Sequence, residues 1–459
     1  MITMRTLEKS EPLAASGEGE PKLPREMPAL SRILMLVPHD PTVDPRVMWV
    51  IAMCGGLMRT DVLAAVWGTK RMTREYSRNV FIERFSISDY SCVTPKFIGA
   101  LFQKLNHFAG WLRGCCSRTV RADSGAADTQ TRVLAGSLLQ FLWAWTSYAT
   151  IICALYRRGR AVSIPPRVCI CHDIFALIPA VLLKRRFGYA VLYDSHELWS
   201  EDDLFAEGWQ KTVVRWVERP FIRRADRVVT VTPQIAKHLE RVYGLPRVVV
   251  TPNAEPFDDD VIPSCRRALT SPIRFLLQGG LSRGRGIETV FQAWRLLRDE
   301  RAVLYVRGVG NEFLDRMKRE FADLVEAGRV IILPPVREHE LVQAAAFADV
   351  GIIPYPGPNL NHLYACPNKL SQYMHAGLAV LSNDLEYVSA MLRKFKSGMT
   401  YDAHDPSTMT RTITQLVDDQ KRLQVMKENA YAAAKDQFNW RHLSVPYREA
   451  IVELARTRN

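Results

Sequence analysis

The chain has 459 residues, a formal net charge of +13, 47% hydrophobic residues and 24% charged residues. So much apolar side chain excludes a collagen-like, fibrous or mostly unfolded protein. At roughly 100 to 200 residues per domain, the length predicts two or three domains, with an active site between two of them. The excess of positive charge predicts an anionic partner, which can be nucleic acid, an acidic lipid surface or a phosphorylated small molecule.

Residues 1–30 have no apolar core segment, so we expect a flexible tail and not a signal peptide. The nine cysteines include no CxxC pair and no His/Cys cluster at zinc spacing. This pattern predicts reduced thiols in a cytoplasmic protein and no metal site.

Short, continuously apolar runs occur in two series. Alternation with helical patterns is typical of parallel sheets that are covered on both faces, so the fold class is α/β. The first series predicts an N-terminal domain over residues 31–257, and the second a C-terminal domain over 273–435. Between them, 258–272 read as a linker, and 436–459 as a terminal helix. The predicted strands are 32–37, 62–67, 168–171, 190–194, 227–232 and 247–252, then 273–280, 302–308, 329–335, 350–355 and 379–383.

Residues 133–156 carry no charge, and this run is long enough to span a bilayer. Polar residues dilute it, however, and the strands predicted on either side of it belong to one sheet. We therefore expect a buried or interfacial helix, within a helical insert over 95–160.

The segment QGGLSRGRGIE (278–288) follows a strand and precedes a helix, where backbone N–H groups can cradle a phosphate. Gly279 and Gly280 lie in this turn, and Arg283 and Arg285 add positive charge. Gly308, in the turn after the next strand, supports the same site. A simple strand-to-helix turn remains the alternative.

The segment CPNKLSQYMHAGLAVLSND (366–384) begins a helix at Asn368 and Lys369, directly after a proline. Lys369 and Gln372 share one face of that helix. Lys369 is therefore expected to point toward a diphosphate, and Gln372 toward a neighbouring polar group. An exposed lysine on an amphipathic helix is the alternative.

In YDSHELW (193–199), His196 and Glu197 follow the carboxyl end of a strand, where they could position an acceptor or transfer a proton. Helix capping by Asp194, Ser195 and Glu197 is the alternative.

These segments, with FADVGIIPY and ADRVVTVTPQIAKHL, resemble the GT-B retaining glycosyltransferases of family 4, which are nucleotide-sugar enzymes of polysaccharide and glycolipid assembly. The resemblance covers about 32–92 and 168–450. It implies two Rossmann-like, doubly wound domains that face a cleft, with the C-terminal helix crossing back to the N-terminal domain.

The resemblance also implies roles for individual residues. The expected catalytic residues are His172, Arg285 and Lys369, of which the two cations stabilise the departing diphosphate. The scheme needs no metal and no cofactor, because the nucleotide sugar is a co-substrate. The expected donor-binding residues are Gly279, Gly280, Arg283, Gly308, Asn368 and Gln372, and those on the acceptor side are Asp44, Arg46, His196 and Glu197.

One departure from the family concerns two glutamates that are separated by seven residues, because Tyr364 and Gln372 occupy their positions. A degenerate member that acts as a non-catalytic scaffold subunit is therefore an alternative, and an epimerase of the same fold is another. The expected partners are a nucleotide-diphosphate sugar, a glycan or lipid-linked acceptor and an anionic membrane surface, with no nucleic acid. We expect a cytoplasmic protein that lies peripherally on the inner face of the cell membrane.

Overall fold

The structure is a computed structural model that describes residues 32–68, 73–77, 79–90, 125–203, 205, 208–357 and 359–457. The chain divides into two compact units. The first runs to Val229 and also contains Leu239–Val249 and the chain from Arg448 on, whereas the second contains Thr230–His238 and Val250–Tyr447. Residues 250–272, which the sequence assigned to the end of the first domain and to the linker, lie in the second unit.

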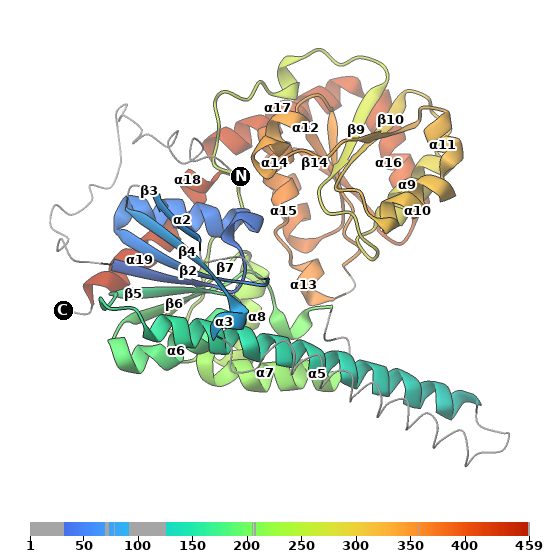
Figure 1. Cartoon of the computed structure of the whole chain (residues 1–459). Helices are drawn as coiled ribbons and strands as arrows, with labels where there is room; N and C mark the ends of the chain where they lie inside the picture. Colours follow the sequence, from blue (N-terminus) through green and yellow to red (C-terminus); the bar gives the residue numbers. More distant parts are fainter. Residues whose placement is uncertain are drawn as a thin grey trace. The chain divides into compact units, whose positions relative to one another are not determined.

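An eight-stranded sheet forms the first unit, in the order β3-β4-β2-β1-β5-β6-β7-β8 (Figure 1). The pairs on either side of β1 are parallel, and only the pairing of β3 with β4 is recorded as antiparallel. The central strands are buried on both faces, which explains why they are continuously apolar. The bounds are β1 (Arg32–Val37), β2 (Arg59–Val66), β3 (Thr73–Ser77), β4 (Val80–Ser86), β5 (Val168–His172), β6 (Ala190–Ser195), β7 (Arg227–Thr230) and β8 (Val249–Val250).

Helices follow most of these strands. Asp44 caps the first long helix, because its Oδ1 accepts from the backbone N–H of Arg46 at 2.9 Å, and Pro45 occupies the first helical position. The bounds are η1 (Pro41–Val43), α2 (Pro45–Leu57), α3 (Ile87–Tyr90), α5 (Gly125–Arg160), α6 (Asp173–Phe187), η2 (Trp199–Glu201), α7 (Gly208–Ile222) and α8 (Pro233–Tyr243).

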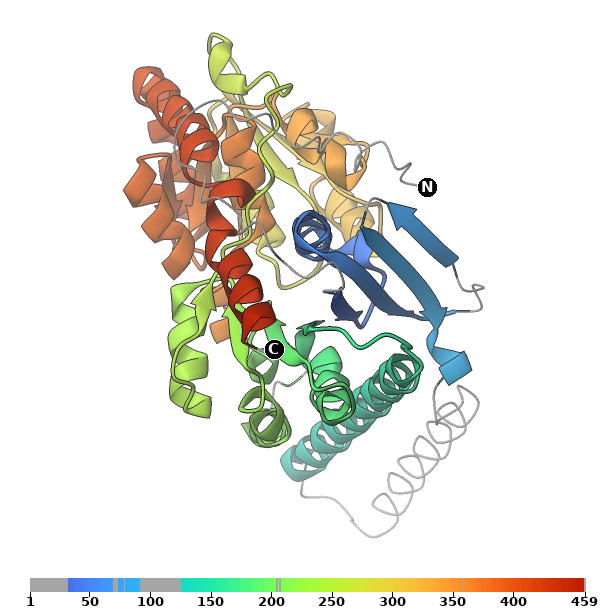
Figure 2. The ribbon, with the colours of Figure 1, turned by 90° about the vertical axis from the view of Figure 1, so that its left-hand side faces the viewer.

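The uncharged run at 133–156 lies within α5, a helix of 36 residues that packs along α6 (Figures 1 and 2). Tyr148 of α5 stacks on Phe175 of α6, with 3.9 Å between the ring centroids. Among the residues that the structure describes, no helix combines the length and apolar character that a bilayer crossing requires. The first part of the predicted insert, 95–124, lies outside the described residues.

The second unit contains a six-stranded sheet in the order β11-β10-β9-β12-β13-β14, and its recorded pairs are all parallel. The strands are β9 (Ile273–Gln278), β10 (Ala302–Arg307), β11 (Val330–Leu333), β12 (Val350–Ile353), β13 (Ala379–Asn383) and β14 (Gly398–Tyr401). Five of the six coincide with predicted strands. This order, which reverses between β9 and β12, is that of a Rossmann-like sheet.

The core of the second unit is apolar and continuous, with Phe275, Phe291 and Trp294 among its buried residues. Helix α9 packs against α16, and α14 packs against α17 (Figure 1). The bounds are η3 (Ser264–Arg266), α9 (Ile287–Leu296), α10 (Glu312–Glu320), α11 (Ala322–Glu326), η4 (Glu338–Glu340), α12 (Leu341–Ala345), α13 (Leu360–Leu363), α14 (Asn368–His375), α15 (Glu386–Phe395), α16 (Pro406–Asp418), α17 (Gln420–Asp436), α18 (Trp440–Leu443) and α19 (Val445–Arg456).

The predicted terminal helix over 436–459 is in fact two helices, α18 and α19, after the end of α17. From Arg448 on, the chain belongs to the first unit, where Glu453 of α19 forms an ion pair with Arg227 of β7. The C-terminal end therefore returns to the N-terminal domain, as expected.

The prediction that all cysteines are reduced is wrong for one of them. Cys153 of α5 is in a disulfide. The free cysteines of the described residues are Cys54, Cys169, Cys171, Cys265 and Cys366.

Candidate functional site

Three of the four predicted acceptor-side residues, Asp44, Arg46 and His196, meet His172 and Asp194 at the carboxyl edge of the sheet of the first unit. His172 is the last residue of β5, and in the strand register it lies opposite Asp194 of β6. His196 follows directly after β6. Ligands of open α/β sheets bind at this edge, because the loops that follow parallel strands converge there.

Arg46 and Asp194 form a buried pair in this cluster. The guanidinium donates through Nε to Asp194 Oδ2 at 3.1 Å and through Nη2 to Oδ1 at 2.8 Å. The two side chains are 1% and 0% exposed. Such bidentate pairs are strong and geometrically specific, and removal of one partner leaves an uncompensated buried charge. Arg46 therefore fixes Asp194 in place.

The imidazole rings of His172 and His196 are hydrogen-bonded, with His172 Nδ1 3.0 Å from His196 Nε2. His196 Nδ1 also lies 3.3 Å from Asp44 Oδ2, and its Nε2 lies 3.4 Å from Asp194 Oδ2. Both nitrogens of His196 thus face carboxylates, which can only accept. The His172 side chain is fully buried, whereas that of His196 is 11% exposed.

The two histidines have opposite charge preferences. Burial lowers the pKa of His172 to about 3. Burial would also lower the pKa of His196, but Asp194, Asp173 and Asp44 raise it well above its usual value. At neutral pH, His196 is therefore an imidazolium and His172 a neutral ring. The Nε2 atom of His172 is buried and has no hydrogen-bond partner in the described structure.

Asp173 stands beside this cluster in an unusual backbone conformation. Its φ is +65°, in the left-handed region that non-glycine residues rarely adopt. Burial raises the pKa of its carboxyl group to about 6. Strained residues often occur at functional sites, so this residue adds to the case for a site here.

His172, Asp194 and His196 could in principle hold a metal ion, because their ligand atoms lie within 4.8 Å of one another. Both oxygens of Asp194, however, accept from Arg46, and the neighbouring carboxylates favour a proton on each nitrogen of His196. A cation would have to displace these contacts. The donor set therefore fits a hydrogen-bonded cluster better, and the absence of a metal stays a prediction.

Sequence reasoning missed the importance of Asp194 and Asp173. Asp194 was considered only as a helix cap, whereas it pairs with Arg46. Glu197 is exposed, and its backbone carbonyl accepts a hydrogen bond from Ser195 Oγ.

In the second unit, the glycine turn after β9 lies against the start of α14. Gly279 has a φ of +107°, and a β-carbon there would lie 2.9 Å from Lys369 Nζ. A β-carbon on Gly308 would lie 2.7 Å from the carbonyl oxygen of Gly279. Glycine at both positions therefore allows the turn to approach the lysine closely.

Tyr355, two residues after β12, connects the two predicted diphosphate-binding cations. Its hydroxyl accepts from Lys369 Nζ at 2.9 Å, and the Arg285 guanidinium lies 5.5 Å from its ring centroid. Burial would raise the pKa of Tyr355, but Lys369 and then Arg285 outweigh it and lower the pKa. The structure thus brings Gly279, Lys369 and Arg285 together around a tyrosine that sequence reasoning missed.

Gln372 lies one helical turn after Lys369 and is 3% exposed. Its Nε2 donates to Glu255 Oε1 at 3.0 Å and to Glu338 Oε1 at 3.3 Å. Neither glutamate was predicted as a site residue, since each is distant from Gln372 in sequence.

The remaining predicted donor-binding residues are Asn368 in α14 and Gly280 and Arg283 in the turn after β9. Asn368 is the first residue of α14, and its buried Oδ1 has no hydrogen-bond partner in the described structure. Gly280 and Arg283 lie on the exposed part of the turn between β9 and α9.

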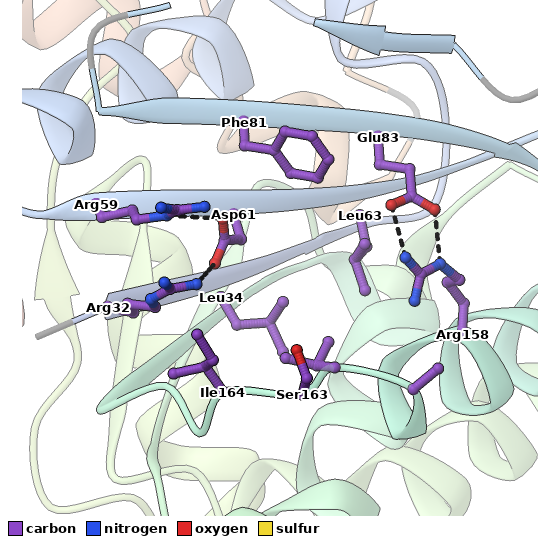
Figure 3. Close-up of a pocket in the computed structure, with 12 residues that line it drawn as sticks. Arg32, Leu34, Arg59, Asp61, Leu63, Phe81, Glu83, Arg158, Ser163 and Ile164 are labelled. Carbon is purple, nitrogen blue, oxygen red and sulfur yellow. Dashed lines mark hydrogen bonds and ion pairs between the residues drawn. The ribbon is translucent and has the colours of Figure 1, made fainter. Parts of the chain in front are cut away.

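A cavity of about 220 Å³ lies elsewhere in the first unit, near the amino ends of β1 and β2 (Figure 3). Arg158 donates to both oxygens of Glu83 at 2.6 Å, and Arg32 pairs with Asp61 at 3.3 Å. Arg59 also pairs with Asp61, at 3.5 Å, so all three arginines of the cavity are engaged by its two carboxylates. The cavity lies at the strand ends opposite to the histidine cluster. We do not assign it to the site.

Two known domain families match this chain. Residues 108–254 match the glycosyl transferase 4-like domain, and residues 272–419 match the domain of glycosyl transferases group 1. A D-inositol 3-phosphate glycosyltransferase from Thermobispora bispora is 27% identical over 327 residues, which are 65% of this chain and 75% of that protein.

Solved structures with the same fold include a sucrose-phosphate synthase from Thermosynechococcus elongatus, with 14% identity and a TM-score of 0.66 over 92% of this chain and 99% of that one. HepE from Anabaena, solved in complex with UDP, has 10% identity and a TM-score of 0.60 over 92% of this chain and 100% of that one. Together with the two domain matches, which span more than half of the chain, these likenesses identify the protein as a glycosyltransferase of group 1 with the GT-B fold.

Proposed function

We propose that the protein is a retaining glycosyltransferase that moves a sugar from a nucleotide-diphosphate donor to a glycan or lipid-linked acceptor in polysaccharide or glycolipid biosynthesis. The observation that carries this proposal is that Lys369 and Arg285 both contact Tyr355, and that the ammonium group of Lys369 also lies close to the backbone of Gly279. Two cations beside a glycine turn suit the diphosphate of a donor, whose charge increases as the sugar leaves.

The nature of the donor is supported by two proteins of the same fold. HepE was solved with UDP, and the E. coli protein described as trehalose-6-phosphate was solved with UDP-2-fluoro glucose, at 11% identity and a TM-score of 0.60. A nucleoside diphosphate is therefore the ligand class that we propose for the second unit.

The histidine cluster of the first unit supplies the groups for the sugar or the acceptor. We assign the direct contact to His196, because its ring is partly exposed whereas that of His172 is fully buried. His172 then acts as a positioning residue, since its buried ring is hydrogen-bonded to that of His196. An imidazolium at His196 can donate to a sugar hydroxyl and stabilise negative charge.

An acceptor presented at a membrane requires a surface that binds lipid, and α7 carries a candidate. Trp209 and Trp216 are 41% and 76% exposed and share one face of the helix, seven residues apart. The acidic residues of α6 and α7, Asp173 and Glu218, are both buried. Exposed arginines on and next to these two helices are Arg185, Arg186, Arg219, Arg223 and Arg224.

Tryptophan and arginine side by side are typical of helices that lie in the interface of an anionic membrane. We therefore propose that this face, defined by Trp209, Trp216, Arg219 and Arg223 and called the α7 tryptophan face, contacts the inner face of the cell membrane.

A thermal-shift panel of UDP-, GDP- and ADP-sugars tests the proposed activity. A bound donor raises the melting temperature in proportion to the logarithm of its concentration. We expect one nucleotide class to stabilise the protein and to release its nucleoside diphosphate when the acceptor is added. Stabilisation without any release of nucleoside diphosphate would instead favour a scaffold subunit.

A further inference from the structure

The side-chain amide of Gln372 holds two carboxylates at once. Its nitrogen carries two hydrogens and cannot accept, so its two contacts, at 3.0 Å to Glu255 and 3.3 Å to Glu338, use both of them. Because Gln372 is only 3% exposed, its amide is confined between the two glutamates.

This trio lies close to the cations that we assign to the diphosphate. Gln372 follows Lys369 by three residues on the same face of α14, a rise of about 4.5 Å along the helix. Glu338 begins η4, in the segment that follows the carboxyl end of β11. In a nucleoside diphosphate, the ribose is joined directly to the first phosphate, so its two hydroxyls fall within reach of such a neighbour.

A pair of vicinal hydroxyls offers two donors, which a carboxylate can accept with its two oxygens, whereas Gln372 has only one accepting oxygen. The two glutamates differ in how well they suit this task. Burial raises the pKa of Glu255 to about 7, so that this group is partly protonated at neutral pH. Its backbone N–H is also bonded to Ser371 Oγ at 3.0 Å. Glu338, in contrast, is exposed and can meet a ligand.

We propose that Glu338 is the residue that accepts hydrogen bonds from the ribose hydroxyls of the donor, and that Gln372 positions it. The inference rests on the proposed function, because it assumes a nucleoside diphosphate beside Lys369. The proposal also explains why position 372 holds a glutamine and not a glutamate. A glutamate at position 372 would place three carboxylates together, and their mutual repulsion would oppose binding.

Calorimetric titration of the full chain with UDP and with 2′,3′-dideoxy-UDP tests the inference, and GDP with its dideoxy form is run alongside. The informative variants are Glu338→Ala and Gln372→Ala. A matched control is Glu340→Gln, because Glu340 lies in the same turn but bonds to Arg337 at 2.6 Å. We expect Glu338→Ala to weaken UDP binding roughly 10-fold or more and to leave dideoxy-UDP binding unchanged. Gln372→Ala should partly reduce the preference for UDP over dideoxy-UDP, and Glu340→Gln should leave that preference unchanged.

Equal losses for both nucleotides in Glu338→Ala, or no loss for either, would overturn the role of Glu338 while the proposed function stands. If the unaltered protein binds none of UDP, GDP and ADP, the proposed function fails and the inference fails with it.

Discussion

Lys369 and Gly279 approach so closely that a β-carbon at position 279 would lie 2.9 Å from Lys369 Nζ. We therefore expect Gly279→Ala to displace the ammonium group and to weaken donor binding about 10-fold, measured by titration with the nucleoside diphosphate. The matched control is Gly284→Ala. Its φ of +80° imposes a similar backbone strain, but nothing lies within 4 Å of its β-carbon position. Equal losses in the two variants would show that strain, and not contact with Lys369, causes the effect.

The histidine pair predicts a division between contact and positioning. His196→Ala should lower kcat about 100-fold or more, because it removes the partly exposed charged ring. His172→Gln should lower kcat less and leave the donor KM nearly unchanged. His39→Gln is the control, because His39 Nε2 lies 3.9 Å from Asp44 Oδ2 and the described structure records no hydrogen bond from His39 to either histidine of the pair. A larger loss for His172→Gln than for His196→Ala would contradict the assignment.

The same cluster predicts a pH effect. Asp194, Asp173 and Asp44 keep the pKa of His196 well above its usual value, although burial opposes them. Asp44→Asn removes one of these charges, so the ring should lose its proton at a lower pH. In a profile of kcat against pH, the alkaline limb should therefore move to lower pH. An unchanged profile would mean that the charge of His196 is not needed.

Glu218 of α7 predicts how stability depends on pH. It is 2% exposed and accepts from the hydroxyls of Tyr193 and Tyr243, and burial raises its pKa to about 7. The unfolded value is about 4.3, so between these values the folded state binds more protons, and the free energy of unfolding falls as pH rises. The loss approaches about 4 kcal/mol.

Glu218→Gln cannot ionise, so its melting temperature should fall less between pH 5 and pH 8 than that of the unaltered protein. The control is Glu453→Gln, which changes an exposed acid of the same unit. Parallel pH curves for Glu218→Gln and the unaltered protein would exclude this role for Glu218.

The α7 tryptophan face is tested by sedimentation with vesicles. We expect binding to vesicles that contain phosphatidylglycerol, and a loss of about 10-fold when Trp209 and Trp216 are both changed to serine. Trp67→Ser is the control, because Trp67 is 53% exposed but lies after β2. Binding to neutral vesicles alone, or an equal effect of Trp67→Ser, would contradict the proposed surface.

The sequence was sufficient to predict the central strands, because a buried parallel strand must be apolar on both faces. It did not reveal β3, with the sequence TREYS, or β14, with GMTY, since edge strands carry polar and small residues. It also missed β4 (Val80–Ser86), an inner strand whose sequence VFIERFS contains two charged residues. Candidate site residues that lie in recognisable motifs, such as His172 at the end of β5 and Lys369 at the start of α14, could be predicted from the sequence. The pairs Arg46–Asp194 and Gln372–Glu255 could not, because they join residues more than 100 positions apart in the sequence.

The central claim is that Lys369 stabilises the diphosphate of a sugar donor as it leaves. The most direct test is the rate at which nucleoside diphosphate is released from the nucleotide sugar that the thermal-shift panel identifies. We predict that Lys369→Met lowers this rate about 100-fold or more, whereas Lys394→Met, which changes an exposed lysine of the same unit, leaves it unchanged. Release by Lys369→Met at the rate of the unaltered protein would contradict the account.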